Sequence, residues 1–443
     1  MGLTGEFLEF YRTANMREGI LCWYPFEHDA HVLDLSGGVL TDLLGTRAVQ
    51  LHTEHTSGTK YDYVVALDPP DMRTEALCAY AHMLKPQARL LLAYENPFAL
   101  RYWAGHSAPD SGQPYDTLFG RGKNPLPSKA ELQQRLERAG FLGQKWYYPL
   151  ADHWLTTEVY SDSYLPNELL KQRFVPYIDN DASLHYDERG LYREIVRGGA
   201  FEFMCGAYLV EAQINKEDPP CDVEYAAVTA YREPGKRFAT LLKTDGRVYK
   251  TPLDKSGKMT VRQIAANHAE LRRCGVNAVE CVVENDVLVM PRIELPTLGD
   301  HWVDSLLRGS WNDDEVVRLF DRIRDDIHRA ARGGRCYWEM VPDNCFYDVS
   351  TDELTYFDQE YYADDRDPDF AVARAVGVLK FSAVLSKDPH VQALYDSILK
   401  RYTLADEFKA IAATTYAEVY GEEHERYQQI IRQNAAALAK RRL

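Results

Sequence analysis

Apolar and polar positions in the first half of the chain alternate between the repeat of a strand and the repeat of a helix. Strand-like apolar runs occur at 31–35 (HVLDL), 48–55, 61–68 (YDYVVALD) and 88–96 (ARLLLAYEN). Helix-like runs lie at 73–86 and 126–141, and Ser128 with Glu131 forms a capping-box pattern at the start of the second. Strands that alternate with helices predict a mostly parallel, doubly wound sheet, so we expect an α/β domain over residues 1–215.

The pattern changes near residue 222 to a cluster of short strands. Strand-like runs at 226–231, 238–243 and 247–253 are followed by a helix-like run at 261–275 and by two more strands. The Asp245-Gly246 turn before the third strand is a strong hairpin signal. Five strands with one helix after the third is the layout of a protein-kinase-like small lobe. We therefore predict a kinase-like α+β domain at 222–403, with a small lobe at 222–296 and a large lobe at 297–403.

Two further stretches predict helices. The run at 311–331 opens with Asn312 as a cap and carries an apolar stripe at helical spacing, namely Leu319, Phe320, Ile323 and Ile327. Residues 404–443 also favour a helix, and their apolar positions are typical of a helix that packs on its own lobe. We therefore expect a C-terminal helical segment at 404–443.

The overall charge narrows the range of partners. The chain of 443 residues carries a formal net charge of −16, which argues against a general nucleic-acid-binding role because phosphate contacts need a basic surface. Its eight cysteines include no C-x-x-C pair, a pattern that suits thiols in a reducing cytoplasm. No stretch approaches the roughly 18 apolar residues that a membrane helix needs, and the N-terminus lacks a secretion signal. We therefore expect a cytoplasmic protein without a transmembrane segment.

A short glycine segment follows the first predicted strand. Asp34 lies near the end of that strand, Ser36-Gly37-Gly38 comes next, and a helix-like run begins directly after. This order is typical of the start of a nucleotide-binding α/β domain, because glycines let a ligand approach the helix N-terminus closely. Asp34, Gly37 and Gly38 are therefore the candidate cofactor-binding residues of the first half.

Several segments of the first half resemble class I S-adenosylmethionine-dependent methyltransferases, namely KYDYVVAL, the helix that ends in MLKP, LLLAYEN and ELQQRLERAGF. More narrowly, YENPFALRYWAG, KWYYPLADHW and VYSDSYLPN are similar to bacterial methyltransferase-like proteins of surface-polysaccharide gene clusters of the O-antigen type, over roughly residues 20 to 380. The resemblance implies a Rossmann-like methyltransferase-type domain followed by a protein-kinase-like (aminoglycoside-phosphotransferase-like) domain. It also implies S-adenosylmethionine as cofactor, a saccharide or lipid-linked glycan as acceptor, and glycosyltransferases as partners.

Two departures from that family indicate that the methyltransferase half has lost its cofactor. The glycine loop is reduced to Gly37 and Gly38, and only 28 positions separate Asp34 from Asp62, about half the separation usual in that family. Glu54 is the only nearby acid that could bind the ribose hydroxyls. A missing strand and helix would remove the walls of the cofactor crevice, so loss of S-adenosylmethionine binding is the favoured interpretation.

The second half carries the residues expected of a nucleotide site. Lys250 falls near the end of the third strand, where it would neutralise nucleotide phosphates while pairing with an acid of the next helix, and Glu270 is the candidate. The turn REPGKR, with Gly235, would lie over the phosphates. The alternatives are a solvated strand lysine, and a glutamate on an exposed helix face beside Arg272 and Arg273.

The stretch EMVPDNCFYDVSTDELTYFDQE, residues 339–360, orders its acids like the metal- and phosphate-handling clusters of kinase-like phosphotransferases. Such enzymes place a catalytic Asp five positions before an Asn, and a metal-binding Asp across a short hairpin. The same register gives Glu339, Asn344 and Asp358 here, and the family that the chain resembles also carries the Asp-Gln-Glu that begins at Asp358. We expect Asn344 and Asp358 to bind Mg²⁺. Glu339 would act as a slower base or an orienting group, because its extra methylene shifts the carboxylate.

Three functions fit these patterns. The first is a cytosolic transferase of surface-glycan assembly, in which the kinase-like half binds ATP and Mg²⁺ and phosphorylates a saccharide or lipid-linked glycan. The second keeps S-adenosylmethionine-dependent methyl transfer in the first half. The third is a non-catalytic scaffold that recruits glycosyltransferases through its acidic surface.

Overall fold

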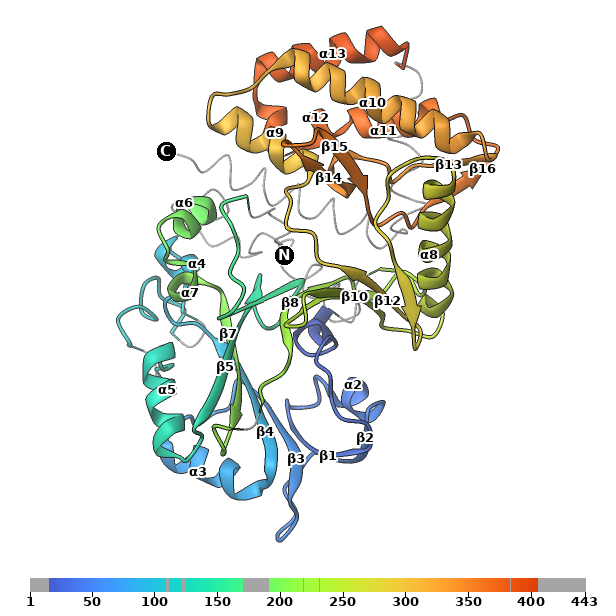
Figure 1. Cartoon of the computed structure of the whole chain (residues 1–443). Coiled ribbons are helices and arrows are strands. Elements are labelled where there is room, and N and C mark those ends of the chain that lie inside the picture. The colour runs from blue at the N-terminus through green and yellow to red at the C-terminus, as the bar shows by residue number, and fades with distance from the viewer. Residues whose placement is uncertain are drawn as a thin grey trace, which may run out of the picture. The chain divides into compact units, whose positions relative to one another are not determined.

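A computed structural model describes residues 16–404, apart from 109–110, 122–124, 170–190, 218, 231 and 383. The chain forms two compact units (Figure 1). The first unit takes the chain up to Arg232 together with Arg237–Asp245, and the second takes Glu233–Lys236 and the chain from Gly246 to the last described residue. The helical segment predicted at 404–443 lies outside the described residues, except for Leu404.

The first unit is built on a mixed sheet. Four strands run parallel in the order β2-β1-β3-β4, with the bounds β1 Ala30–Leu35, β2 Ala48–His52, β3 Tyr61–Leu67 and β4 Leu84–Glu95. Beyond β4 the order is β7-β5-β6-β8-β9 and each neighbouring pair is antiparallel, with the bounds β5 Gly143–Leu150, β6 Glu158–Ser161, β7 Ala207–Gln213, β8 Val223–Val228 and β9 Phe238–Lys243. Among the described strands of this unit, the predicted parallel arrangement therefore holds for β1 to β4 and not for the others. Antiparallel neighbours such as β5 and β6 need only a short connection, whereas parallel neighbours need a crossover.

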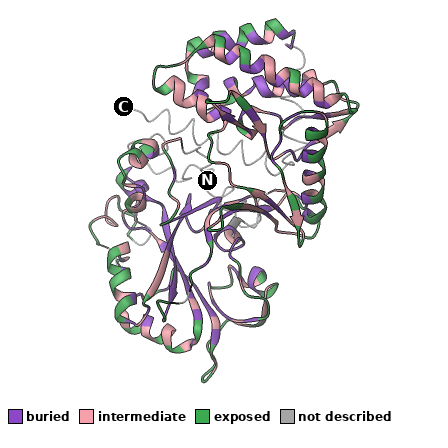
Figure 2. Ribbon diagram, in the orientation of Figure 1, coloured by how far each residue is buried: buried purple, intermediate pink, exposed green. Residues whose placement is uncertain are grey.

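The helices of the first unit are mostly short. They are η1 Met16–Ile20, α2 Thr41–Gly45, α3 Thr74–Met83, α4 Leu100–Trp103, α5 Lys129–Arg138, α6 Tyr192–Arg197 and α7 Phe201–Met204. The predicted capping box of α5 is confirmed, because Ser128 Oγ accepts from Glu131 N and the Glu131 carboxylate accepts from Ser128 N. Apolar residues of the central strands pack against α3 and α5 to form the core, and Figure 2 shows β7 buried along its length.

The second unit begins with an antiparallel sheet, in the order β11-β12-β10, and one long helix. The bounds are β10 Arg247–Pro252, α8 Gly257–Arg273, β11 Val282–Glu284 and β12 Val287–Pro291. The predicted order of three strands, a helix and two strands is confirmed when β8 and β9 are counted with these elements. The buried face of α8 includes two polar residues, Asn267 and His268, beside Ile264 and Leu271. Such polar groups need hydrogen-bond partners inside the protein.

Helices make up most of the rest of the second unit. The elements are α9 Leu298–Leu307, α10 Asp313–Ala331, β13 Arg335–Tyr337, η3 Pro342–Asn344, β14 Cys345–Asp348, β15 Glu353–Tyr356, β16 Tyr362–Asp364, α11 Asp369–Val376, α12 Val378–Phe381, η4 Leu385–Lys387 and α13 Pro389–Tyr402. The prediction for α10 is confirmed, since Asn312 caps it and its apolar stripe is buried in the core of this unit.

Two further expectations concern thiols and membranes. All eight cysteines lie in the described part of the chain, and each is a free thiol. Between residues 16 and 404, none of the described helices combines the length and the apolar character that a membrane span requires.

Candidate functional site

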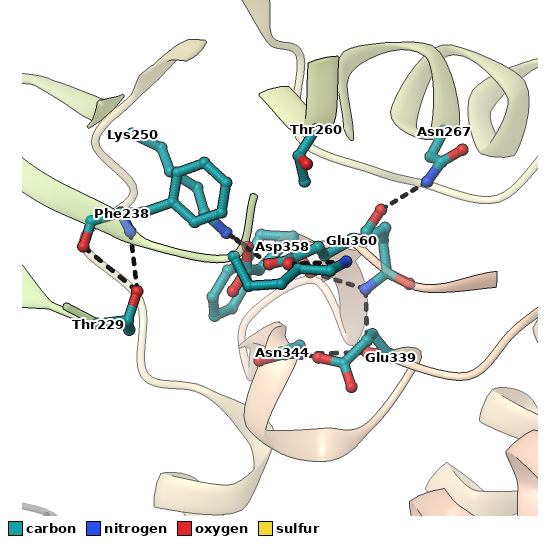
Figure 3. Close-up of polar contacts among 12 residues, drawn as sticks. Thr229, Phe238, Lys250, Thr260, Asn267, Glu339, Asn344, Asp358 and Glu360 are labelled. Atoms are coloured by element: carbon teal, nitrogen blue, oxygen red, sulfur yellow. Dashed lines mark hydrogen bonds and ion pairs between the residues drawn. The ribbon is translucent and has the colours of Figure 1, made fainter. Parts of the chain in front are cut away.

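Lys250 is a buried cation that lies between two carboxylates of the second unit, those of Asp358 and Glu360 (Figure 3). It belongs to β10, and only 5% of the residue is exposed. Its Nζ atom forms ion pairs with the Asp358 carboxylate and with Glu360 Oε2, the latter at 3.2 Å. A lysine is almost never buried without a partner, because removing its charge from water is costly. The two carboxylates therefore hold Lys250 in place.

Asp358 reaches the lysine from a tight bend that follows β15. Its φ angle is +51°, a left-handed conformation that residues other than glycine rarely adopt. Backbone strain of this kind persists only where the surrounding contacts stabilise it, and it is frequent at functional sites. The Asp358 side chain is 40% exposed, so a ligand can reach its carboxylate.

The hairpin formed by β14 and β15 places Asn344 beside this bend. Cys345 pairs with Tyr356 at the open end of the hairpin, and Phe357 N donates to Asn344 O at 2.9 Å. Asn344 and Asp358 therefore lie at the same end of one hairpin, and Figure 3 shows Asn344 next to Glu339 and Asp358 next to Glu360.

Asn344 and Asp358 fit the chemistry of a magnesium site in part. Both carry hard oxygen atoms of the kind that Mg²⁺ prefers. The amide nitrogen of Asn344 donates to Glu339 O at 3.3 Å and to Glu339 Oε2 at 3.0 Å, which leaves the amide oxygen as the atom that can bind a cation. Among the described residues, no group of three or more His, Cys, Asp or Glu could hold a metal ion.

Glu339 is held from two sides. Its Oε1 atom pairs with Arg374 of α11 at 2.5 Å, and its Oε2 atom accepts from Asn344. Burial raises the pKa of Glu339, and the nearby Asp358 and Glu360 carboxylates act in the same direction against the effect of Arg374. The carboxylate is therefore fixed in orientation, and it binds a proton more readily than an ordinary glutamate does.

The helix α8 is joined to the segment after Asp358 through its two buried polar residues. Asn267 Nδ2 donates to Gln359 O at 2.8 Å, and Gln359 N donates to His268 Nε2 at 3.3 Å. The second ring nitrogen of His268 lies 2.8 Å from Val279 O. Burial lowers the pKa of His268, which keeps the ring neutral, with one nitrogen donating and the other accepting. These bonds fix the position of the Asp-Gln-Glu segment relative to α8.

The turn Glu233–Lys236 is anchored to the beginning of α8. Gly235 N donates to the Asp254 carboxylate at 2.9 Å, and Thr260 Oγ1 donates to Gly235 O at 2.8 Å. Gly235 has a φ angle of +86°, which suits glycine. The sequence predicts this turn as a phosphate-binding segment, but the amide of Gly235 is already engaged by Asp254.

Glu270, the predicted helix partner of Lys250, lies outside the buried face of α8. Its carboxylate pairs with Arg273 at 2.6 Å, and this hydrogen-bonded pairing lowers the pKa of Glu270. The described carboxylate partners of Lys250 are Asp358 and Glu360 instead. Asn267 and Glu270 are three positions apart and so share a broad face of α8, and the packing of the helix turns Asn267, and not Glu270, towards the Asp-Gln-Glu segment.

The glycine segment of the first unit differs from the Lys250 site, because its acid bonds only to nearby residues in the contacts described below. Asp34 is buried, and its carboxylate accepts from Ser36 N at 2.8 Å and from Thr41 Oγ1 at 2.7 Å. Gly37 and Gly38 have φ angles of +67° and +91°, as a tight turn requires. The helix α2 that follows has only five residues. The acid predicted to serve a cofactor is therefore used to close its own loop.

Sequence reasoning included Glu360 in the Asp-Gln-Glu match without giving it a role, and it did not select four other residues that the structure brings to the site, namely Lys236, Asn267, His268 and Arg374. The sequence contained one usable signal for two of them. Asn267 and His268 interrupt the apolar face of an amphipathic helix, and a polar residue on such a face must find a partner. Arg374 carries no comparable signal, because its pairing with Glu339 depends on how α11 packs.

No protein-family model matches the chain, and no curated protein sequence matches it. Among solved structures, WaaP in complex with acyl carrier protein is 15% identical with a TM-score of 0.28, covering 47% of this chain and 87% of that chain. The PknI kinase domain of Mycobacterium tuberculosis is 13% identical with a TM-score of 0.29, covering 49% and 96%. Vaccinia related kinase 3 is 12% identical with a TM-score of 0.25, covering 40% and 71%. All three TM-scores are low, so a function has to be argued from the residues of the site.

Proposed function

We propose that the domain predicted at 222–403 binds ATP with Mg²⁺ and transfers its γ-phosphoryl group to a hydroxyl group, as a kinase-like phosphotransferase. One observation carries this proposal. The buried Lys250 is held by Asp358, at the end of a hairpin that also presents Asn344. A lysine next to a metal-binding carboxylate can neutralise phosphates at the point where the metal binds them.

The contacts of these residues support distinct roles in binding. Asp358 and Asn344 would supply oxygen ligands for Mg²⁺, which would neutralise part of the charge of the phosphates. Lys250 contacts two carboxylates, and it can exchange one of them for a phosphate oxygen while keeping the other. The lysine thus keeps a counterion both before and after the nucleotide binds.

Glu339 is the proposed acceptor of the hydroxyl proton. In the transfer step, the acceptor oxygen forms a bond to the γ-phosphorus, and the bond from that phosphorus to the β-phosphate oxygen breaks. The hydroxyl proton passes to Glu339, whose raised pKa favours its uptake. Arg374 holds the carboxylate in one orientation during this step.

The proposed acceptor is a saccharide or a lipid-linked glycan in the cytoplasm. This part of the proposal rests on the resemblance carried by segments such as YENPFALRYWAG and KWYYPLADHW, and glycosyltransferases are the corresponding partners. The hydroxyl groups of a sugar are suitable acceptors for the chemistry described above, because each can lose a proton to a fixed carboxylate.

A second candidate function is nucleotide binding without turnover. It is favoured by one observation, that both carboxylate oxygens of Glu339 are engaged, by Arg374 and by Asn344. A base must release at least one such contact to accept a proton from a substrate. Methyl transfer has less support, because Asp34 is satisfied within its own loop.

Calorimetric titration of the full chain with ATP tests the proposal, with and without Mg²⁺. We expect Mg²⁺-dependent binding and slow release of phosphate by the wild-type protein. Asp358→Ala removes a carboxylate ligand, and we expect it to weaken binding on the order of 100-fold. Asp364→Ala is the matched control, because Asp364 is exposed on β16 and pairs only loosely with Arg335 at 3.4 Å. Turnover of ATP by Asp358→Ala at the wild-type rate would overturn the site assignment.

A further inference from the structure

Glu360 lies between two lysines of the second unit. Its Oε2 atom is 3.2 Å from Lys250 Nζ, and its Oε1 atom is 3.3 Å from Lys236 Nζ. The Glu360 side chain is only 2% exposed, whereas that of Lys236 is 29% exposed. Because both ammonium groups contact one carboxylate, they lie close enough to bind neighbouring phosphates of a single nucleotide.

Lys236 is held in this position by its own turn and by an aromatic ring. Its backbone N donates to Glu233 O at 2.9 Å, and the preceding Gly235 is bonded to Asp254 and Thr260. The Nζ atom lies 4.0 Å from the centroid of the Tyr361 ring, a favourable cation–π distance. A lysine that is already ordered loses less side-chain entropy when a ligand binds.

The anchoring of the turn affects how it can contact an anion. In phosphate-binding turns the backbone amides usually point at the anion. Here the amide of Gly235 donates to Asp254, and Asp254 also accepts from Gly257 N at the start of α8. The positive charge that this turn presents to the site therefore comes from the side chain of Lys236.

We infer that Lys236 is a second phosphate-binding cation of the nucleotide site, and that Glu360 positions Lys236 and Lys250 together. This inference rests on the proposed ATP-binding function, and it adds a preference for nucleotides with several phosphates. Two lysines face the two carboxylates Asp358 and Glu360 in this cluster. If Asp358 served a metal ion, the two ammonium groups would share the single carboxylate of Glu360, and this excess of positive charge would favour phosphate oxygens.

The test measures the affinity of the full chain for ATP and for AMP, each with Mg²⁺, by calorimetry. We expect Lys236→Met to weaken ATP binding roughly tenfold or more, as the loss of a charge-assisted contact predicts, and to change AMP binding much less. Lys236→Arg keeps the charge and should retain most of the ATP affinity. Lys258→Met is the matched control, because Lys258 pairs with Asp286 on the exposed side of α8 and its loss should leave ATP binding unchanged.

The outcomes separate this inference from the function on which it rests. If the wild-type protein binds no ATP, the proposed function fails. If the wild-type protein binds ATP and Lys236→Met binds it equally well, the proposed function stands and the role of Lys236 is wrong. If Lys236→Met weakens ATP and AMP by the same factor, the lysine serves the local structure and does not contact the outer phosphates. An unchanged circular dichroism spectrum checks that each variant is folded.

Discussion

The two units each contain an acid that the sequence marks as a site residue, and the structure satisfies the two acids in different ways. Asp34 bonds to Ser36 and Thr41, which lie within seven positions of it. Asp358 bonds to Lys250, which is 108 positions away, and the adjoining Glu360 also contacts Lys236. An acid that its own loop satisfies stabilises a turn. An acid that is satisfied by cations from distant strands and turns lies where several elements converge, and such a place can bind a ligand.

Among the variants that test this contrast, we expect Lys250→Met to have the largest effect on stability and on ATP binding. This variant removes one of the two lysines that contact the buried Glu360, and Lys236 is the one that remains. Removing one partner of a buried ion pair typically costs about 3 kcal/mol, so we expect the second unit to lose about that much free energy of unfolding, together with ATP binding. Asp34→Ala removes two hydrogen bonds of a loop, and we expect a loss of about 1–2 kcal/mol in the first unit with ATP binding unchanged.

Urea unfolding combined with hydrogen exchange measures both losses and assigns each to a unit. Because the chain has two compact units, the unfolding transition must be followed by probes in each. The contrast between the two acids would be wrong if Lys250→Met and Asp34→Ala lost the same free energy of unfolding and Lys250→Met still bound ATP.

A smaller effect sharpens the role of α8 in the second unit. Asn267→Ala removes the buried amide that donates to Gln359 O, and we expect a cost of about 2 kcal/mol and weaker ATP binding. Glu270→Ala removes a surface pair with Arg273, and its cost should stay within about 0.5 kcal/mol. Chemical denaturation of the two variants compares them directly. If Glu270→Ala lost more free energy of unfolding than Asn267→Ala, the result would favour Glu270 as the helix partner of Lys250, as the sequence predicts.

The smallest expected effect is a pH dependence from His268. Burial lowers its pKa below the usual 6.5, so the unfolded chain binds the proton more tightly than the folded chain. The stability that the neutral ring contributes is therefore present above about pH 6.5 and is lost as the pH falls towards the lower pKa of the folded state. Thermal unfolding between pH 7 and pH 5 should show a steeper decline for the wild-type protein than for His268→Gln. His390→Gln, which changes an exposed histidine, should keep the wild-type slope.

Much of the fold can be predicted from the sequence, because its signals are local. The capping box at Ser128, the Asn312 cap of α10 and its buried stripe each depend on residues within a few turns. The hairpin that carries Asn344 and Asp358 has a short polar turn between two apolar strands, which is also a local pattern. These features are present in the structure where the sequence places them.

The features that sequence reasoning missed depend on packing between distant segments. The antiparallel half of the first sheet depends on which strands lie side by side, and hydrophobic periodicity does not specify neighbours. Asn267 and Glu270 lie three positions apart on α8, and only the packing of this helix decides which one faces Gln359. The engagement of the Gly235 amide by Asp254 also joins residues that lie outside one local pattern.

Thermal unfolding of the full chain with ATP and Mg²⁺, and separately with S-adenosylmethionine, tests most directly whether the second unit is the ligand-binding one. A ligand at 100 times its dissociation constant adds about 2.7 kcal/mol to the stability of the state that binds it, which is seen as a raised midpoint. We predict a raised midpoint with ATP and Mg²⁺, and no change with S-adenosylmethionine. A midpoint that rises with S-adenosylmethionine alone would contradict this and would assign the binding site to the loop around Asp34.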